Sequence, residues 1–460
     1  MDKLVIERSR PLTGTLTVNG AKNSVLPIMA ACLLTDEPSV IEHVPMVTDV
    51  MTMLDILRQL GVQVAYAGSE LRIHPDGFRG YVAPYELVSR MRASICLLGP
   101  LLARQGRASV SLPGGCVIGP RPVDLHLKGL QALGASIEIE HGYIMAECGR
   151  LKGSRIHLGG DRGSSVLATG NVMMAAALAD GVSMIEHAAC EPEVVDLADF
   201  LVSMGARIEG QGGSTIRVEG VERLHGSSRY RIISDRIEAG TLAMAAAMTG
   251  GSVTLEGARS DHLEAVIEKL REAGVQITVE PGRLRVKAAD HLRAVNVTSL
   301  PYPGFPTDLQ AQIMALLCLA DGVSVITEKI YPERFLHVPE LNRMGAAITR
   351  EGATAVVKGM GQLSGAQVVA SDLRASAALV LAGLAASTQT EVRGLEHLDR
   401  GYQNIETQLR QLGAHLVRVP EEQTVAPQPQ ETVVAQANGV PAPGQRNRRA
   451  KRYTRAERKQ

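Results

Sequence analysis

The chain of 460 residues has no tryptophan, four phenylalanines and nine tyrosines. This scarcity of aromatic side chains disfavours a protein that stacks nucleic-acid bases or binds carbohydrate on tryptophan. No run of about 18 apolar residues without a charge occurs, which disfavours a membrane protein. The amino terminus, MDKLVIERSRPLTG, has only a short apolar stretch before Glu7 and Arg8. We therefore expect no signal peptide and a cytoplasmic location.

The sequence also lacks metal-binding patterns. No two of its six cysteines have the spacing CxxC, and no cluster of cysteine and histidine resembles a zinc site. We expect no metal and no cofactor. Cys32, Cys96 and Cys318 lie in apolar helical stretches, so we predict that these three thiols are buried in the core.

Net charge is zero, but the charges are unevenly distributed. Residues 446–460 contain eight Lys/Arg and one Glu, so the other 445 residues carry a net charge of −7. A mildly acidic body does not resemble a DNA-wrapping surface. Residues 419–460 are predicted to be a disordered Pro/Gln-rich linker followed by a basic tail. A solvated tail is favoured over one that binds RNA or anionic lipid, and we expect no other nucleic-acid partner and no membrane partner.

One short pattern, an amphipathic stretch that ends in glycine and a small apolar residue, recurs six times. The copies are LRQLGV (57–62), LQALGA (130–135), LVSMGA (201–206), LREAGV (270–275), LNRMGA (341–346) and LRQLGA (409–414). Their glycines are spaced by 68 to 73 residues. Such a period indicates six structural repeats.

Each repeat has the same internal order. An apolar helix, such as residues 171–181, is followed by a strand, an amphipathic helix that ends at the glycine, and two short strands. The glycine fits a left-handed cap after the last helical turn. We predict an α/β (α+β) fold of six βαβαββ repeats. Residues 22–230 would form one domain of three repeats, and residues 1–21 with 231–418 would form the other.

In each domain the apolar helices are expected inside and the sheets outside. The amino-terminal strand is expected to complete the second domain. Six repeats could also build a ring clamp for DNA, but the acidic body and the residues described next argue against that alternative.

Cations lie just before several of the buried helices. Lys22, Arg92 and Arg374 stand where a helix begins. The positive end of the helix dipole makes a cation there unfavourable unless an anion is bound. We therefore predict sites for phosphate or carboxylate groups, whereas neighbouring polar residues could simply cap the helices.

The segment LPGGCVIGPRPVDLH, residues 112–126, has three glycines and three prolines and is predicted to be a surface loop. It contains Cys116, and Arg121 follows five residues later. An exposed thiol close to a cation suits covalent or proton-transfer chemistry. An incidental surface thiol is the alternative.

At these motifs the sequence resembles the UDP-N-acetylglucosamine 1-carboxyvinyltransferases, a family of enolpyruvyl transferases. The resemblance covers about residues 1–418 and rests on NGAKNSVLP, MRASI, LPGGCVIGPRPVDLH, FPTDLQAQ, HVPELNRMGA, DLRASAALVLAG and DRGYQNIE. It implies two inverse α/β-barrel-like domains. It also implies transfer of the enolpyruvyl group of phosphoenolpyruvate to the 3′-hydroxyl of UDP-N-acetylglucosamine with release of phosphate, the first committed step of peptidoglycan synthesis.

The resemblance assigns roles to individual residues. The catalytic residues would be Cys116 as proton donor, Asp308 as base, Lys22 and Arg400. Phosphoenolpyruvate would be bound by Lys22, Asn23, Arg92, Arg121 and Arg400. The nucleotide sugar would be bound by Arg92, Arg121, Pro122, Val123, Asp124, Leu125, Ser164, Ser165, Val166, Asp308 and Ile330. Arg374 and Asp372 are assigned to the substrate cleft, and Cys116 would be the target of the epoxide antibiotic fosfomycin.

The chain departs from the family pattern at three positions. Thr48 precedes Asp49 in a segment that often carries a lysine, and Gly163 and Leu167 replace the lysine and glycine that flank the SV motif in some members. These changes concern contacts to the diphosphate. A transferase for shikimate 3-phosphate is an alternative, although it would lack the PGGC loop. An inactive regulator that binds nucleotide sugars is another, and the joint presence of the four catalytic residues argues against it.

Overall fold

The computed structural model describes residues 2–112, 122–161 and 163–420. These residues belong to one compact unit. Cys116 and Arg121 lie outside the described residues, as do residues 421–460, which hold the basic tail and most of the linker. The described strands form six four-stranded sheets, as six repeats require.

The repeat order predicted from the sequence is confirmed, and the third repeat illustrates it. Its sheet has the order β10-β11-β13-β12, with β10 and β11 parallel and the other two pairs antiparallel. Helix α6 connects the parallel strands, because a parallel pair needs a crossover, and helix α7 follows β11. The last two strands, β12 and β13, form a hairpin. The unit is therefore βαβαββ.

The other sheets have the orders β14-β3-β5-β4, β6-β7-β9-β8, β16-β17-β15-β2, β18-β19-β21-β20 and β22-β23-β1-β24. The strands are β1 (Asp2–Ile6), β2 (Thr13–Thr17), β3 (Ser39–Glu42), β4 (Gln63–Ala67), β5 (Glu70–His74), β6 (Val82–Ala83), β7 (Arg107–Ser111), β8 (Ser136–Glu140), β9 (Tyr143–Glu147), β10 (Arg155–His157), β11 (Val182–Glu186), β12 (Arg207–Glu209), β13 (Thr215–Glu219), β14 (Tyr230–Arg231), β15 (Ser252–Glu256), β16 (Gln276–Glu280), β17 (Arg283–Lys287), β18 (Val297–Ser299), β19 (Val323–Glu328), β20 (Ala347–Glu351), β21 (Thr354–Lys358), β22 (Gln367–Val369), β23 (Thr390–Arg393) and β24 (Leu416–Pro420).

Apart from the four-residue helices α3 and α13, the helices fall into two kinds, buried and amphipathic, that alternate along the chain. The helices are α1 (Lys22–Ala31), α2 (Thr48–Gln59), α3 (Tyr85–Val88), α4 (Leu98–Gln105), α5 (Asp124–Ala132), α6 (Val166–Ala176), α7 (Pro192–Ser203), α8 (Arg236–Met248), α9 (Glu264–Glu272), α10 (Gln310–Leu317), α11 (Val338–Arg343), α12 (Leu373–Ala385), α13 (Leu395–Leu398) and α14 (Ile405–Gln411). Short 3-10 helices are η1 (Cys32–Leu34), η2 (Arg92–Leu97), η3 (Ser260–His262) and η4 (Thr307–Leu309).

Two strands are exchanged between distant repeats in a way that the repeat pattern alone does not predict. Strand β14 follows the third repeat in the sequence, but it pairs in parallel with β3 of the first repeat. Strand β2 takes the equivalent place beside β15 in the fourth repeat. Strand β1, which was expected to complete the second domain, lies between β23 and β24 in the sixth sheet.

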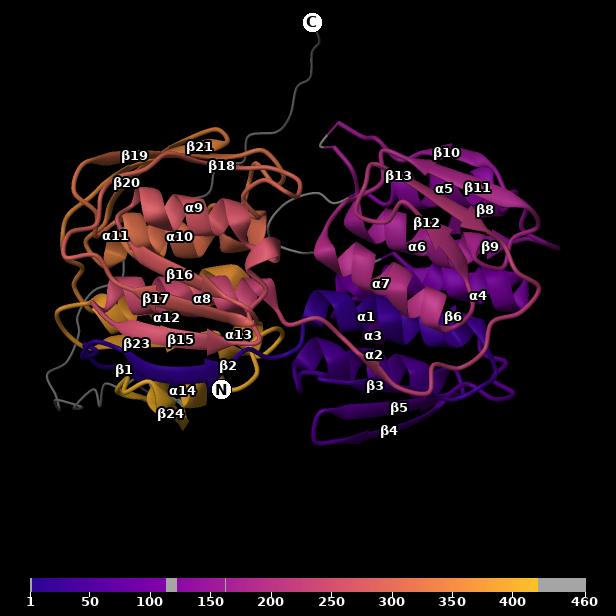
Figure 1. The fold of residues 1–460 in the computed structure, drawn as a ribbon, viewed down its shortest axis with the longest axis horizontal. Helices are drawn as coiled ribbons and strands as arrows, with labels where there is room; N and C mark the ends of the chain where they lie inside the picture. The colour runs from indigo at the N-terminus through magenta and orange to yellow at the C-terminus, as the bar shows by residue number, and fades with distance from the viewer. Residues whose placement is uncertain (1, 113–121, 162, 421–460) are drawn as a thin grey trace, which may run out of the picture. The chain divides into compact units, whose positions relative to one another are not determined.

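The buried hydrophobic residues form two clusters. One contains residues between Val25 and Ile232, and the other contains Leu4 to Val18 together with residues between Ile237 and Leu416. Helices α8, α10 and α12 contact one another in the second cluster and lie among its sheets (Figure 1). Their apolar residues point in all directions because every side of each helix is buried. The predicted domain limits stay a prediction, except that Val419 and Pro420, expected in the linker, belong to β24 and pair with β1.

The amphipathic helices end as the sequence predicts. The six marker glycines, at positions 61, 134, 205, 274, 345 and 413, have φ between +88° and +99°. In the first repeat, Gly61 N donates to Arg58 O and Val62 N to Leu57 O, and the other five ends repeat this pair of bonds. This Schellman motif satisfies carbonyl groups that the helix leaves free. On α9, Val266, Ile267 and Leu270 are buried on one face, as expected.

A substitution at one marker glycine tests this cap. A Cβ at Gly134 would meet no atom within 4 Å, so only its backbone angle of +98° opposes a side chain. Gly134→Ala should lower the free energy of unfolding in urea by about 1–2 kcal/mol. Gly149 also faces open space but has no positive φ, so Gly149→Ala should change that free energy by less than about 0.5 kcal/mol. Equal effects of the two substitutions would contradict the assigned cap.

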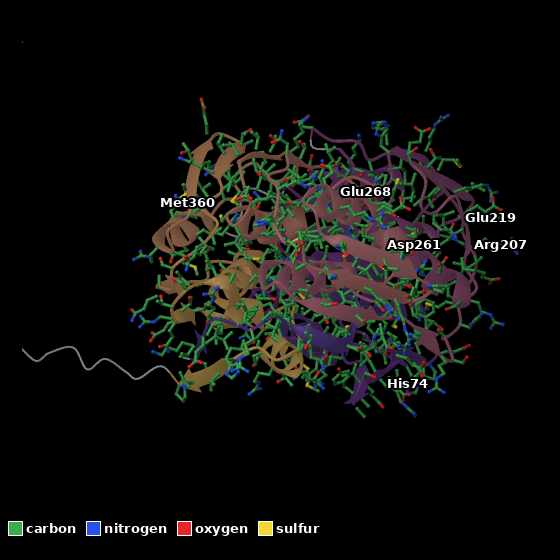
Figure 2. All side chains as sticks on the ribbon, turned by 60° about the vertical axis from the view of Figure 1, so that its left-hand side comes forward. His74, Arg207, Glu219, Asp261, Glu268 and Met360 are labelled. Atoms are coloured by element: carbon green, nitrogen blue, oxygen red, sulfur yellow. The ribbon has the colours of Figure 1, made fainter. Side chains whose placement is uncertain are left out.

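Charged side chains occupy the strand faces that point away from the core. Arg207 on β12 and Glu219 on β13, for example, form an outward-facing ion pair of 2.6 Å (Figure 2). Cys32, Cys96 and Cys318 are buried, which confirms the prediction for these three thiols. None of the described helices combines the length and the apolar character needed to cross a membrane.

Candidate active site

The first part of the site is an ion-pair bridge centred on Asp49. Lys22 is the first residue of α1, Asp49 is the second residue of α2, and Arg400 lies just after α13. Lys22 Nζ lies 2.8 Å from Asp49 Oδ2, and Arg400 Nε lies 2.9 Å from Asp49 Oδ1. We call these three residues the Asp49 bridge. It joins two cations that are 378 positions apart and that the family resemblance assigns to phosphoenolpyruvate.

Asp49 is charged in this setting. Its carboxylate is buried, and burial alone would raise its pKa, but the adjacent Lys22 and Arg400 lower the pKa below its usual value. Lys22 is also buried, with 8% of its surface exposed. A buried ammonium group at a helix amino terminus requires anions nearby. Asp49 supplies one such anion.

The second part of the site is centred on Asp308, in the 3-10 helix η4. Asp308 Oδ1 lies 2.8 Å from Arg334 Nη1, and Asp308 Oδ2 lies 2.8 Å from Arg374 Nη2. Asn23 Nδ2 lies 3.5 Å from Asp308 Oδ2. We call these four residues the Asp308 bridge. Because Asn23 follows Lys22, the two bridges meet at the start of α1.

Asp308 is fixed as an anion. Burial would raise the pKa of its carboxyl, but Arg374 and Arg334 hold that pKa well below the usual value. Although Asp308 lies just before a helix, its side chain contributes to the packing of the site, because it neutralises two arginines whose side chains are 4% and 6% exposed.

Neighbouring polar groups hold the arginines of the Asp308 bridge in place. Arg334 Nη1 also donates to Thr307 Oγ1 at 3.0 Å, and Thr307 in turn donates to Glu328 at 2.9 Å. The other oxygen of Glu328 accepts from the backbone N–H of Ile330 at 2.8 Å. Hydrogen bonds through Glu328, Thr307 and Arg334 thus connect Ile330, a predicted nucleotide-sugar contact, to Asp308. The guanidinium group of Arg374 lies 5.4 Å from the centre of the Tyr402 ring.

Two of the predicted nucleotide-sugar segments lie against each other. Pro122 to Leu125 lead into α5, and Arg92 Nη2 reaches Pro122 O at 3.3 Å. A Cβ added at Gly160 would lie 3.2 Å from Leu125 Cδ1, so the strand end before α6 packs on the start of α5. Ser165 caps α6, where its hydroxyl oxygen accepts from Ala168 N at 3.3 Å. Pro122 and Asp124 are exposed and Val123, Leu125, Ser164, Ser165 and Val166 are half-buried.

The structure gives a reason for one departure from the family pattern. Gly163 has φ of +89°, and a Cβ there would lie 3.2 Å from Pro301 Cγ. A lysine at this position would be strained in this backbone. Glycine in place of lysine therefore suits the positive φ of the backbone at position 163.

Asp372 caps a helix, which is the alternative role that the sequence left open for polar residues at the helix starts. It caps α12, where its carboxylate accepts from the backbone N–H groups of Arg374 and Ala375 at 2.9 and 3.1 Å. Its assignment to the substrate cleft stays a prediction, as do the other residue roles. The cap explains how Arg374 is fixed at the first turn of a buried helix.

Asp49 and Arg334 belong to the site although no sequence pattern points to them. Asp49 appeared only as the neighbour of Thr48, and Arg334 lies in a segment, YPERF, that carries no recognisable pattern. Their ion pairs with distant residues assign them to the site. Among residues 2–112, 122–161 and 163–420, no group of three His, Cys, Asp or Glu side chains could hold a metal ion.

The two bridges together have an excess of positive charge. Four cations, Lys22, Arg334, Arg374 and Arg400, form direct ion pairs with two carboxylates, and the nearby Asp235 and Asp372 offset part of the remaining positive charge. Such an excess in a largely buried setting attracts anionic ligands. The arrangement can hold phosphate and carboxylate groups beside a carboxylate that could accept a proton.

Comparison with known proteins identifies the family. The family model described as EPSP synthase (3-phosphoshikimate 1-carboxyvinyltransferase) matches residues 6–409. The UDP-N-acetylglucosamine 1-carboxyvinyltransferase of Methylacidiphilum infernorum is 54% identical over 91% of this chain and 99% of its own length. The enzyme of the same name from Geotalea uraniireducens is 52% identical over 92% of this chain and all of its own.

Solved structures agree with these relatives. The enolpyruvyl transferase NikO from Streptomyces tendae is 25% identical, with a TM-score of 0.82 over 91% of this chain and 98% of its own. EPSP synthase from Acinetobacter baumannii is 20% identical, with a TM-score of 0.72 over 91% of this chain and all of its own, and supports the fold alone. The predicted α/β fold and the predicted resemblance are thereby confirmed. The chain is an enzyme that belongs to the UDP-N-acetylglucosamine 1-carboxyvinyltransferase family of enolpyruvyl transferases.

Proposed function

We propose that this enzyme transfers the enolpyruvyl group of phosphoenolpyruvate to the 3′-hydroxyl of UDP-N-acetylglucosamine and releases phosphate, at the start of peptidoglycan synthesis. Its substrates are small molecules. The observation that carries the proposal is the meeting of the two bridges at Lys22 and Asn23. It brings the residues assigned to phosphoenolpyruvate next to the residue assigned as base. The cytoplasm stays the predicted location.

The reaction needs a proton donor and a proton acceptor. The 3′-oxygen adds to C2 of phosphoenolpyruvate while C3 gains a proton, which gives a tetrahedral ketal. Loss of phosphate from C2 and of a proton from C3 then restores the double bond. We assign the first protonation of C3 to Cys116 and the removal of the hydroxyl proton to Asp308. Lys22 and Arg400 would hold the anionic groups of phosphoenolpyruvate.

The ion pairs of Asp308 bear on its role as base. A carboxylate held by two guanidinium groups is a weak base, because its pKa is well below the usual value. Bound substrate anions would attract Arg374 and Arg334 and weaken their hold on Asp308. We infer that Asp308 becomes a stronger base only after the substrates have bound.

The nucleotide specificity of the enzyme is part of the same proposal. Relatives named for UDP-N-acetylglucosamine match nearly their whole length at 51–54% identity. The structures named EPSP synthase are 20% identical. We therefore favour UDP-N-acetylglucosamine over shikimate 3-phosphate as the acceptor.

A phosphate-release assay tests the proposal. The purified chain is incubated with phosphoenolpyruvate and either UDP-N-acetylglucosamine or shikimate 3-phosphate. We expect phosphate release, and a product heavier than the acceptor by one enolpyruvyl group, only with UDP-N-acetylglucosamine. Release only with shikimate 3-phosphate, or with neither acceptor, would refute the proposal.

A further inference from the structure

Asp49 is a buried carboxylate that takes no part in the chemical steps assigned above. Its side chain is 4% exposed, and both of its oxygens are engaged, one by Lys22 and one by Arg400. Lys22 is 27 positions before it in the sequence, and Arg400 is 351 positions after it. A single carboxylate therefore fixes the distance between two cations that come from opposite ends of the chain.

Backbone contacts reinforce this link on both sides of Asp49 and Arg400. Thr48 N donates to Asp399 O at 2.9 Å, and Met46 N donates to the side chain of Gln403 at 2.8 Å. Asp399 is itself held by Arg418, with Nη2 at 2.7 Å. Residues 46–49 and 399–403 therefore lie against each other through three separate contacts. Of these three contacts, the one made by Asp49 is the one that involves Arg400, and Asp49 also pairs with Lys22.

Among the described residues, the Asp49 bridge leaves several hydrogen-bond donors of Lys22 and Arg400 without a partner. Asp49 binds only the Nε edge of Arg400, and within the described residues no hydrogen-bond partner faces the two terminal nitrogens of that guanidinium group. Lys22 gives one ammonium proton to Asp49, and an ammonium group has three. A guanidinium edge and an ammonium group held side by side can bind one phosphate or one carboxylate together.

We propose that Asp49 is a positioning residue that holds Lys22 and Arg400 as one anion-binding pair for phosphoenolpyruvate. This inference rests on the proposed function and extends it to a residue that touches no substrate. Without the carboxylate, two buried like charges repel each other, and each side chain is free to adopt other rotamers. The pair would then no longer be arranged in advance for its ligand.

The nature of the contact points to an informative substitution. In Asp49→Asn the side chain keeps its size, but only its oxygen can accept a hydrogen bond, and its NH₂ group faces the second cation. Asp49→Glu keeps the charge and moves it by one methylene group. Asp55→Asn is the matched control, because Asp55 lies on the same helix, is exposed and pairs with Arg58 at 2.8 Å outside the site.

The test separates the two substrates. We expect Asp49→Asn to raise the KM for phosphoenolpyruvate about 10-fold or more, because the variant would weaken hydrogen bonds between the charged groups of Lys22 and Arg400 and the ligand. The KM for UDP-N-acetylglucosamine should stay within about 2-fold, and Asp49→Glu should give an intermediate KM for phosphoenolpyruvate. Asp55→Asn should match the unaltered enzyme in both constants.

A purely structural role for Asp49 would give another pattern. An unchanged KM for phosphoenolpyruvate with a lower thermal midpoint in Asp49→Asn would overturn the proposal, as would an equal rise in both KM values. Should Asp49→Asn fail to fold, Asp49→Glu decides, and unaltered affinity for phosphoenolpyruvate in that variant would refute positioning.

A calorimetric titration makes the outcome independent of the acceptor assignment. Phosphoenolpyruvate is titrated into the unaltered chain and the three variants without UDP-N-acetylglucosamine, so that no turnover contributes to the heat. If the unaltered enzyme releases no phosphate with UDP-N-acetylglucosamine, the proposed function fails. Weaker binding of phosphoenolpyruvate to Asp49→Asn would still support the positioning role, and equal binding would still contradict it.

Discussion

Asp308→Asn is expected to lower kcat by about 10²- to 10⁴-fold, the range that general-base catalysis contributes. The amide has nearly the same shape as the carboxylate but cannot take up the hydroxyl proton. The variant should also unfold at a lower temperature, because Arg334 and Arg374 would be left buried without their counter-ion. Phosphate release under saturating substrates and a thermal melt measure the two effects.

Asp261→Asn is the control for this prediction. Asp261 is exposed and pairs with Arg259 at 2.6 Å away from the two bridges, so its loss should leave kcat unchanged. If Asp308→Asn keeps near-native kcat, Asp308 is not the base. If kcat falls and the thermal midpoint does not, the ion pairs with Arg334 and Arg374 do not stabilise the fold.

The low pKa of Asp308 sets the pH range in which its stabilising effect should vanish. A carboxyl group whose pKa is lower in the folded than in the unfolded state stabilises the protein above its unfolded pKa, near 4. That contribution is lost as the pH falls through the folded value, which lies well below 3.8. The thermal midpoints of the enzyme and of Asp308→Asn should therefore differ most near pH 7 and converge in strong acid.

Much of the fold could be predicted from the sequence because its signals are local. A left-handed glycine, an amphipathic face and an alternating hairpin each depend on a few neighbouring residues, and six copies made the pattern recognisable. Gly274 and the buried face of α9 are examples. The exchange of β2 and β14 between the first and fourth repeats has no local signal, because it depends on which distant edge each strand meets.

The same distinction applies to the site. Lys22, Arg92 and Arg374 were found because a cation at a helix amino terminus is locally unfavourable. Asp49 and Arg334 carry no such sign, since both lie at ordinary positions in their segments. What makes them part of the site is pairing across the chain, with Arg400 and with Asp308. The sequence gives the residue types but not which charges meet.

Cys116→Ser is expected to lower kcat by about 10²-fold or more, because a serine hydroxyl is too weak an acid to replace the thiol as proton donor to C3. Cys116 lies outside the described residues, so this expectation rests on the sequence and the family. Cys116→Asp keeps an acid and should retain turnover. Cys148→Ser, at a half-buried thiol, is the control and should match the unaltered enzyme.

Alkylation offers an independent test, because four of the five described cysteines are poor targets. Burial raises the pKa of Cys32, Cys96 and Cys318 to about 12, so about one thiol in 10⁵ is ionised at pH 7. Burial, and then the charge of Glu191, also raise the pKa of Cys190.

Because the thiolate is the nucleophile, iodoacetamide and the epoxide fosfomycin should label Cys116 first. The Cys116→Asp variant should then resist inactivation by fosfomycin. Mass-spectrometric labelling on Cys148 or Cys190, with Cys116→Asp still inactivated, would show that another thiol is the target.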